Sequence, residues 1–193
     1  MSNIKVCKLQ EICEFQLGYQ FRRKPEYVSD GNYRIAQMKD IHNYTLNTSE
    51  LSKVKLEDVK EDYLIDKGTV LFTPRGFNNG AALVMDKLEN TIAAGLFYII
   101  RVKDSSVLPE YITWYLNQKP AQKYFASNRA GTSIPTINIG FLKELEIKIP
   151  DLEVQEKIAH IFYLSLREKE LTINLQEKKQ QLIEAVLLEK INI

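Results

Sequence analysis

The C-terminal fifth of the chain constrains the fold most, because one long segment contains none of the residues that end a helix. From Leu152 to Glu189 there is no Gly and no Pro, and Glu, Lys, Gln and Leu are frequent, which is the composition of a long helix. Pro150 suits the helix entry, and Asp151 fits the N-cap position. Residues 154–189 would span roughly 54 Å as a helix. A rod of that length extends beyond a compact domain of residues 1–150, so we expect residues 151–193 to be a separate helical part that needs a partner surface.

The same segment carries an apolar seam when it is read as heptads. The seam positions are Ile161, Leu164, Glu168, Leu171, Leu175, Lys178, Leu182, Ala185 and Glu189. Six of these nine are apolar, as a coiled coil requires. A parallel homodimer would oppose like charges at positions 168 and 178, whereas an antiparallel homodimer centred on residue 173 pairs Glu168 with Lys178. We therefore predict an antiparallel coiled coil with a second copy or a homologous helix. The alternative is a helix packed on its own domain.

Residues 1–150 show a mixed pattern that predicts an α+β domain. Short β-prone runs follow turn residues, and prolines mark the openings of two helices. The expected strands are 33–38, 69–73, 81–85, 96–102 and 145–149, and the expected helices are 109–117 and 120–127. Residues 128–136 read as a polar loop. The expected fold class is a globular mixed α/β domain followed by a long C-terminal helix.

Composition excludes several broad classes of protein. The 193 residues are 45% hydrophobic and 26% charged, which is ordinary for a globular chain and excludes disordered or fibrous ones. No apolar run approaches the ~20 residues of a membrane span, and we expect no secretory signal. Cys7 and Cys13 cannot build a disulfide framework, so we expect reduced thiols in a cytoplasmic protein. A net charge of +1 does not indicate a globally basic nucleic-acid binder, but it leaves local basic patches open.

The chain lacks the common signatures of catalysis and cofactor binding. There is no Walker-type loop, no dinucleotide fingerprint and no Asp/Asn-Pro-Pro-aromatic tetrapeptide of an amino-methyltransferase. The two cysteines have no second pair to complete a zinc site, so we expect no metal. The residues that could form a nuclease-like cluster are Asp86, Glu144, Glu146 and Lys148, in an order that does not match Pro-Asp then Glu-x-Lys. The sequence therefore favours binding over catalysis.

Five motifs follow one another in a recognisable order. The clearest is the helix entry, Pro150-Asp151-Leu152-Glu153-Val154-Gln155-Glu156-Lys157-Ile158. The others lie in segments 9–19, which reads as an opening strand and glycine turn, 67–76, 108–116 and 131–138. This order resembles the DNA-specificity (S) subunit of Type I restriction–modification systems, whose helix entry reads P-x-L-x-E-Q-x-x-I. Here Val154 stands where the family usually has Glu, and Thr69 replaces an acid in the second motif.

The resemblance implies a half-length form, because a full S subunit has two target-recognition domains and two long helices. It implies a non-catalytic subunit that reads double-stranded DNA and positions adenine methyltransferase subunits and, where present, a restriction subunit. S-adenosylmethionine and ATP are expected on those partners, and no cofactor on this chain. Two copies related by a two-fold axis would read a split palindromic site, with helix length setting the spacer; pairing with a different half-subunit would give an asymmetric site. The alternatives are a dimeric scaffold without DNA readout or, less favoured, a small nuclease.

Three segments carry the residue types that contact bases and phosphates. The candidate DNA-binding residues are Tyr19, Gln20, Arg22, Arg23, Lys24, Arg75, Asn78, Asn79, Arg129, Thr132 and Ser133. Gln37, Lys39 and Asn43 are secondary candidates, and Thr136 adds a hydroxyl to the last segment. Each segment also has a structural interpretation: a solvated loop for 19–24, a Gly-Asn turn for 75–80 and an ordinary turn for 129–136.

Overall fold

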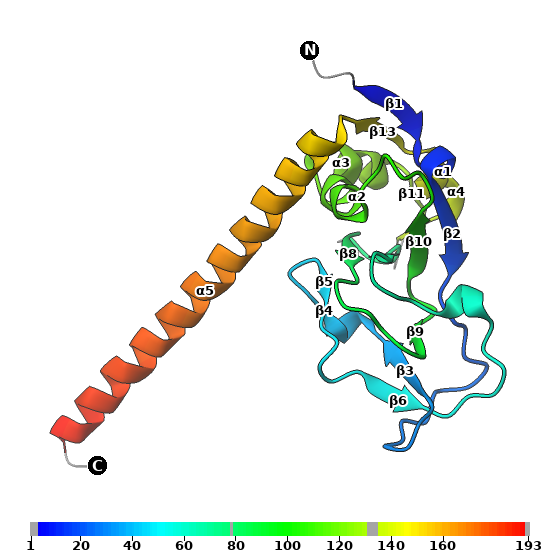
Figure 1. Cartoon of the computed structure of the whole chain (residues 1–193). Coiled ribbons are helices and arrows are strands. Elements are labelled where there is room, and N and C mark those ends of the chain that lie inside the picture. The colour runs from blue at the N-terminus through cyan, green and yellow to red at the C-terminus, as the bar shows by residue number, and fades with distance from the viewer. Residues whose placement is uncertain (1–3, 78, 131–134, 192–193) are drawn as a thin grey trace. The chain divides into compact units, whose positions relative to one another are not determined.

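The computed structural model describes residues 4–77, 79–130 and 135–191 (Figure 1). The chain forms two compact units, residues 1–156 and 157–193. The first unit is a mixed α+β domain, as the sequence predicts, and the second is the continuation of one helix, α5 (Leu152–Lys190). The expected helix, 154–189, is therefore confirmed to within two residues at its start and one at its end. Within the described residues, no helix is long and apolar enough to cross a membrane.

A six-stranded sheet forms the centre of the first unit. Its strand order is β2 (Cys13–Leu17), β10 (Tyr98–Val102), β7 (Val70–Phe72), β8 (Ala81–Leu83), β5 (Thr45–Leu46) and β4 (Ile41–His42). All neighbours pair antiparallel except β5 and β8, which pair parallel. Every residue of β7 is buried, so this strand is covered on both faces. The expected strands at 69–73, 81–85 and 96–102 are confirmed in shorter form.

A second sheet of three strands lies at the end of the unit where β2 leaves the first sheet. Its order is β6 (Ser52–Val54), β3 (Tyr33–Ala36) and β9 (Thr91–Ala93), with β3 parallel to β9. The chain enters it at Gly18, where a Cβ atom would lie 2.1 Å from the carbonyl oxygen of Ala94. Glycine is thus required at this crossing, because any side chain would collide with backbone. Tyr19 then pairs with β9 by donating its N–H to Ala93 O, at 2.8 Å.

Short elements complete the unit around these sheets. They are β1 (Lys5–Lys8) paired with β13 (Glu146–Ile149), β11 (Arg129–Ala130) paired with β12 (Thr136–Ile137), the helices α1 (Leu9–Ile12), α2 (Pro109–Leu116), α3 (Lys119–Ser127) and α4 (Ile139–Glu144), and the 3₁₀ turns η1 (Met38–Asp40) and η2 (Glu61–Tyr63). The expected helices 109–117 and 120–127 are confirmed as α2 and α3. The interpretation of 128–136 as loop alone is wrong at its ends, where β11 and β12 pair.

The opening segment differs from the expected strand. Residues Leu9–Ile12 form α1, and the strand begins only at Cys13. Leu9 and Ile12, three residues apart, are both buried, and this spacing places them on one helical face. The Glu11 carboxylate also accepts the backbone N–H of Lys8, at 2.9 Å, which satisfies a donor near the helix start. Local capping therefore outweighs the strand pattern here.

The entry to α5 is fixed by one buried amide side chain. Gln155 has no exposed surface. Its Oε1 accepts the backbone N–H of Leu108, at 3.0 Å, and its Nε2 donates to Ser106 O and Pro150 O, at 2.9 and 2.8 Å. These bonds tie the first turn of α5 to the segment that leads into α2. The glutamine of the helix-entry motif thus satisfies three backbone groups at once.

Beyond its first turns, α5 carries large apolar side chains that are exposed in the single chain. The exposed apolar seam residues are Ile161, Leu164, Leu171, Leu175 and Leu182. Each is between 52% and 66% exposed. An unpartnered apolar stripe of this kind marks an interaction surface.

Replacing Gln155 with Ala should lower the free energy of unfolding of the first unit by about 2–4 kcal/mol, because three backbone groups lose the partner that the buried Gln155 amide gives them. Urea unfolding followed by the fluorescence of Trp114, the single tryptophan, measures the change. The exposed neighbour Glu156 serves as control, and Glu156→Ala should stay within about 0.5 kcal/mol. Equal stability of the two variants would contradict the role given to Gln155.

Candidate functional site

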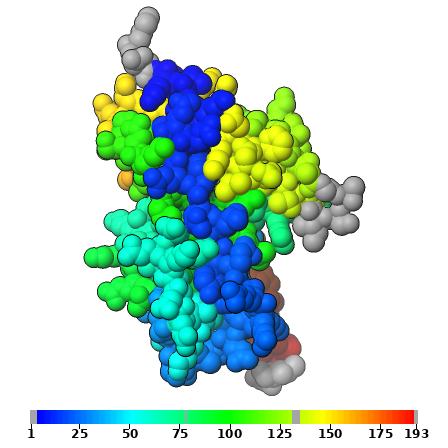
Figure 2. All heavy atoms as spheres, turned by 90° about the vertical axis from the view of Figure 1, so that its right-hand side faces the viewer, coloured from blue at the N-terminus to red at the C-terminus, as the bar shows by residue number. Residues whose placement is uncertain are grey.

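Two adjoining hollows lie on the first unit where segment 19–28 crosses the second sheet. The Met38 hollow, about 450 Å³, is lined by residues 19–21, 25, 27, 35, 37–39 and 94–96 together with Arg75. The Arg22 hollow, about 900 Å³, is formed by segments 19–28 and 54–56 together with Tyr63. Figure 2 shows the start of the chain (blue) running along one face of this unit, next to residues around position 60 (cyan). The structure therefore brings the start of the candidate segment 19–24 into one hollow with Arg75, which lies more than 50 residues away in sequence.

The charges around the two hollows are strongly biased towards cations. The Met38 hollow is lined by Lys39 and Arg75 and by no carboxylate. The residues with charge around the Arg22 hollow are Arg22, Arg23, Lys24, Glu26 and Lys55. The three consecutive cations are exposed, as are Lys39 and Arg75. This part of a nearly neutral chain is therefore suited to a polyanion.

The side chain of Gln20 lines the Met38 hollow, and its amide nitrogen is already bonded within the protein. Its Nε2 donates to Gly95 O at 2.9 Å and to Gly18 O at 3.4 Å. A Cβ atom on Gly95 would lie 2.5 Å from that nitrogen, so glycine lets the amide lie flat on the backbone. Tyr19 is also engaged within the protein, with edge contacts to Phe21 and Tyr63 at ring distances of 4.9 and 5.3 Å.

The turn η1 presents Met38 and Lys39 from a rigid base. Asp40 Oδ2 accepts the N–H of Gln37 at 2.8 Å, and Gln37 Oε1 accepts the hydroxyl of Tyr27 at 3.0 Å. Met38 Sδ accepts the hydroxyl of Thr73 at 3.3 Å, and the ammonium of Lys39 donates to Ser52 Oγ at 3.3 Å. These contacts hold the turn, while Met38 remains 41% exposed.

The loop after β7 is held by two of the candidate residues, Asn79 and Arg129. Asn79 is only 2% exposed. Its Nδ2 donates to Thr73 O and Pro74 O, at 3.2 and 2.8 Å, and its Oδ1 accepts from Arg129 Nε at 2.9 Å. Asn79 is thus wrong as a base-reading residue, because its side chain is buried and engaged within the protein.

Arg129 shares this supporting role. Its Nη2 donates to Phe77 O, and its guanidinium carbon lies 5.9 Å from the centre of the Phe77 ring. The backbone of the same loop is tied to β12, since Gly76 N donates to Pro135 O and Ile137 N to Pro74 O, at 2.8 and 2.9 Å. Arg75 is therefore exposed on a loop fixed from both sides.

Four other sequence candidates lie outside these two hollows or outside the described residues. Asn78, Thr132 and Ser133 lie outside the described residues. Asn43 occupies the β4–β5 turn with a φ of 46°, a left-handed conformation that asparagine tolerates. Sequence reasoning missed Met38, Tyr27 and Leu96, whose exposure depends on how three distant segments meet.

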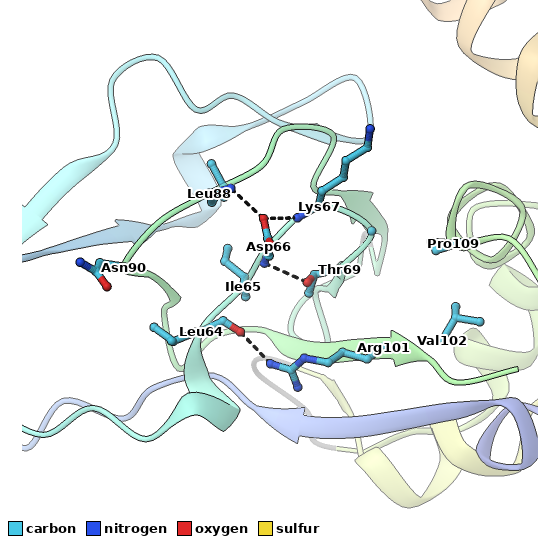
Figure 3. Close-up of a pocket in the computed structure, with 11 residues that line it drawn as sticks. Leu64, Ile65, Asp66, Lys67, Thr69, Leu88, Asn90, Arg101, Val102 and Pro109 are labelled. Atoms are coloured by element: carbon cyan, nitrogen blue, oxygen red, sulfur yellow. Dashed lines mark hydrogen bonds between the residues drawn. The ribbon is translucent and has the colours of Figure 1, made fainter. Parts of the chain in front are cut away.

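A further pocket, near η2, is lined by two charged residues whose hydrogen bonds hold the surrounding segments in place (Figure 3). Asp66 accepts the N–H groups of Leu88 and Lys67, both at 2.7 Å, and these bonds lower the pKa of its carboxyl group. The guanidinium of Arg101 donates to Leu64 O and Asp62 O, at 2.7 and 2.9 Å, while burial lowers its pKa. Arg101 thus secures η2 against β10, while Asp66 ties its own turn to the segment at Leu88.

The residues considered for a nuclease have other partners. Glu144 accepts hydrogen bonds from Lys8 and Gln10, and the bond from Lys8 is the main reason that its pKa is lowered. Asp86 accepts from the Thr48 hydroxyl. Across residues 4–77, 79–130 and 135–191, no group of three His, Cys, Asp or Glu side chains could hold a metal ion. Burial raises the pKa of the Cys13 thiol to about 12, which keeps it protonated at neutral pH.

Comparison with known proteins identifies similar chains. The family model described as the Type I restriction modification DNA specificity domain matches residues 1–185. The chain is 29% identical over 180 residues to the Type I restriction enzyme HindI specificity subunit of Haemophilus influenzae, covering 90% of this chain and 39% of that protein. It is 25% identical over 158 residues to a putative type I specificity subunit N-terminus of Mycoplasma pneumoniae, covering 82% of this chain and 75% of that one.

Solved structures share the fold at low sequence identity. The S subunit of a Type I restriction–modification system from M. genitalium has a TM-score of 0.63 and 19% identity, covering 93% of this chain and 43% of that one. A structure of a type I R-M system described for its complex assembly and conformational transition has a TM-score of 0.69 and 16% identity, covering 95% and 43%. The chain thus spans about two fifths of the HindI subunit and of these solved chains.

Asn79→Ala should lower the free energy of unfolding by about 2–3 kcal/mol, because the carbonyl oxygens of Thr73 and Pro74 lose a donor and Arg129 loses an acceptor. Phe77→Ala, at a position 68% exposed, removes only the ring contact and should cost less than about 1 kcal/mol. Thermal unfolding of both variants measures the difference. If Asn79→Ala is as stable as wild type, the side chain of Asn79 does not hold this loop, and Asn79 is again a candidate for contact with DNA.

Proposed function

Because the chain belongs to the family of Type I restriction–modification DNA-specificity subunits, we propose that it is a non-catalytic subunit that recognises a DNA sequence. It reads one half of a bipartite target with its first unit and positions adenine methyltransferase subunits and, where present, a restriction subunit. S-adenosylmethionine and ATP are bound by those partners. The proposal places the chain in the cytoplasm with the DNA.

One observation carries the DNA-binding part of this proposal. The two hollows gather exposed cations from segments 22–24, 39, 55 and 75, with Glu26 as the single carboxylate on their lining. Lys and Arg at such positions neutralise phosphates, while nearby side chains in the hollow read base edges. The net charge of +1 implies that this patch alone gives weak affinity. Firm binding therefore depends on the assembled complex.

The proposed assembly pairs the α5 helices of two copies in antiparallel orientation. The layers of this pairing are Leu171–Leu175, Glu168–Lys178, Leu164–Leu182 and Ile161–Ala185. Three layers bury apolar side chains that are exposed in the single chain, and the fourth matches opposite charges. Two first units related by a two-fold axis then read inverted copies of one half-site. Pairing with a different half-subunit would give an asymmetric bipartite site.

The dimeric scaffold without DNA readout explains the seam of α5 but gives no role to the gathered cations. The nuclease alternative is not favoured, because Glu144 is paired with Lys8 and Gln10. DNA binding by the complex separates the first alternative from the proposal. Metal-dependent cleavage by the purified chain would be needed for the second.

Genome-wide adenine methylation in the source cell, with and without this gene, tests the function. Removing the gene should abolish methylation at one split palindromic motif. Restoring it with Arg22, Arg23 and Lys24 each changed to Gln should lower the methylated fraction at every copy of the motif, because lost phosphate contacts weaken binding roughly tenfold or more without changing the bases read.

The matched control changes three exposed lysines away from the hollows. These are Lys103, Lys119 and Lys123. Their change to Gln alters net charge equally and should leave methylation intact. If methylation does not depend on the gene, and the complex with its methyltransferase shows no salt-dependent DNA binding, the scaffold alternative holds.

A charge exchange in α5 tests the orientation of the dimer. Glu168→Lys alone should weaken self-association by about 1–2 kcal/mol, roughly tenfold in Kd, because an antiparallel pairing then opposes Lys to Lys178 in two layers. Adding Lys178→Glu should restore it. Analytical ultracentrifugation of wild type, single and double variants measures Kd. A parallel pairing predicts equal association of all three, since like charges face each other in each.

A further inference from the structure

The lining of the Met38 hollow includes three exposed apolar side chains, those of Met38, Leu96 and Tyr27, which we call its apolar floor. Phosphate binding does not require such side chains. We propose that the hollow recognises a thymine of the target half-site by receiving the 5-methyl group against Met38 and Leu96. This inference rests on the proposed function and adds the identity of one base. It assigns base reading to a part of the surface that differs from the cationic segment 22–24.

The floor combines side chains from three distant segments. Met38 is 41%, Leu96 45% and Tyr27 50% exposed, and all three line the same hollow. Large apolar side chains left open next to one another on a surface mark a binding site. In the Arg22 hollow, by contrast, four cations dominate the charged lining, which fits contacts to phosphates.

The charged residues that line the Met38 hollow limit what can occupy it. Lys39 and Arg75 are exposed, and no carboxylate lines the hollow. Their positive charge favours a polyanion over a neutral apolar ligand. A DNA edge inserted here can meet both cations at its phosphates or at guanine, while its apolar part rests on the floor.

Thymine is the base that matches this combination. In the major groove, guanine, cytosine and adenine offer only hydrogen-bonding groups or ring edges, whereas thymine adds a methyl group to its O4 acceptor. Contact between the thymine methyl group and the side chains of Met38 and Leu96 buries apolar surface of both the base and the protein. Lys39, which donates to Ser52 Oγ by one of its three N–H groups, lies on the same turn as Met38.

Met38 is positioned before any ligand arrives. The Thr73 hydroxyl donates to its sulfur at 3.3 Å, and Asp40 closes the turn by accepting Gln37 N–H. The floor next to it is equally constrained, because the Gln20 amide lies over Gly95. A rigid contact surface of this kind loses little freedom on binding.

The test uses duplexes that carry the motif found by adenine-methylation sequencing, or by selection from a random duplex library with the chain and its methyltransferase subunit. Each thymine is replaced in turn by deoxyuridine, which removes only the methyl group, and by 5-bromodeoxyuridine, which keeps its volume. One thymine per half-site should show about fourfold weaker binding as uracil. The brominated base should bind as thymine does.

Two methionine variants assign the effect to this hollow. Met38→Ala should bind the thymine duplex as weakly as the uracil duplex and lose the discrimination between them. Met85→Ala is the matched control, because Met85 is 42% exposed and does not line the hollow, and it should keep the fourfold difference. Thermal unfolding checks that both variants are folded.

The outcomes separate this inference from the proposed function. Absence of any sequence-selective binding would overturn the function itself. Selective binding with no sensitive thymine, or with discrimination that survives Met38→Ala and Leu96→Ala, would overturn the inference and leave the function standing. A methyl effect lost in the Met38 variant and kept in the Met85 variant is the expected result.

Discussion

The contact of Gly18 with Ala94 is the constraint on which the rest of the first unit depends. A Cβ atom at this position would lie 2.1 Å from a carbonyl oxygen, so only glycine lets the chain cross from the six-stranded to the three-stranded sheet. The crossing directs segment 19–24 over the second sheet and places it beside η1 and Arg75. Both hollows share the start of this segment, residues 19–21. The close approach of the Gly18 and Ala94 backbones therefore helps to form the surface that we propose binds DNA.

Polar residues around that surface divide into supports and contacts. Asn79, Arg129 and Gln20 each donate hydrogen bonds to backbone carbonyl groups, and these bonds fix the loops they belong to. Arg75, Lys39 and the cations of 22–24 remain exposed. This division matters for recognition, since a base edge is read well only by groups whose positions are already set. It also explains why an asparagine in a Gly-rich loop can serve the fold even where its residue type suits base reading.

Much of the fold follows from local pattern. The absence of Gly and Pro from 152 to 189 predicts α5 nearly to its ends, and the β-prone runs predict β3, β7, β8, β10 and β13. The segment Leu9–Ile12 is helical where a strand was expected, because the Glu11 cap and two buried apolar residues at helical spacing favour a turn of helix. The candidate cations were found by residue type, whereas Met38 and Leu96 carry no local sign that they remain exposed.

The sequence by itself determined the long helix and the α+β character of residues 1–150, because these depend on neighbours within a few turns and on short local patterns. The pairing of Glu168 with Lys178 across an antiparallel seam stays a prediction from the repeat along that helix. Only the tertiary structure decided that Asn79 is buried against Arg129, 50 residues away, and that Met38, Leu96 and Arg75 share one hollow. Burial and exposure arise from contacts between distant segments. The physical role of a polar or apolar side chain is therefore settled when those segments pack.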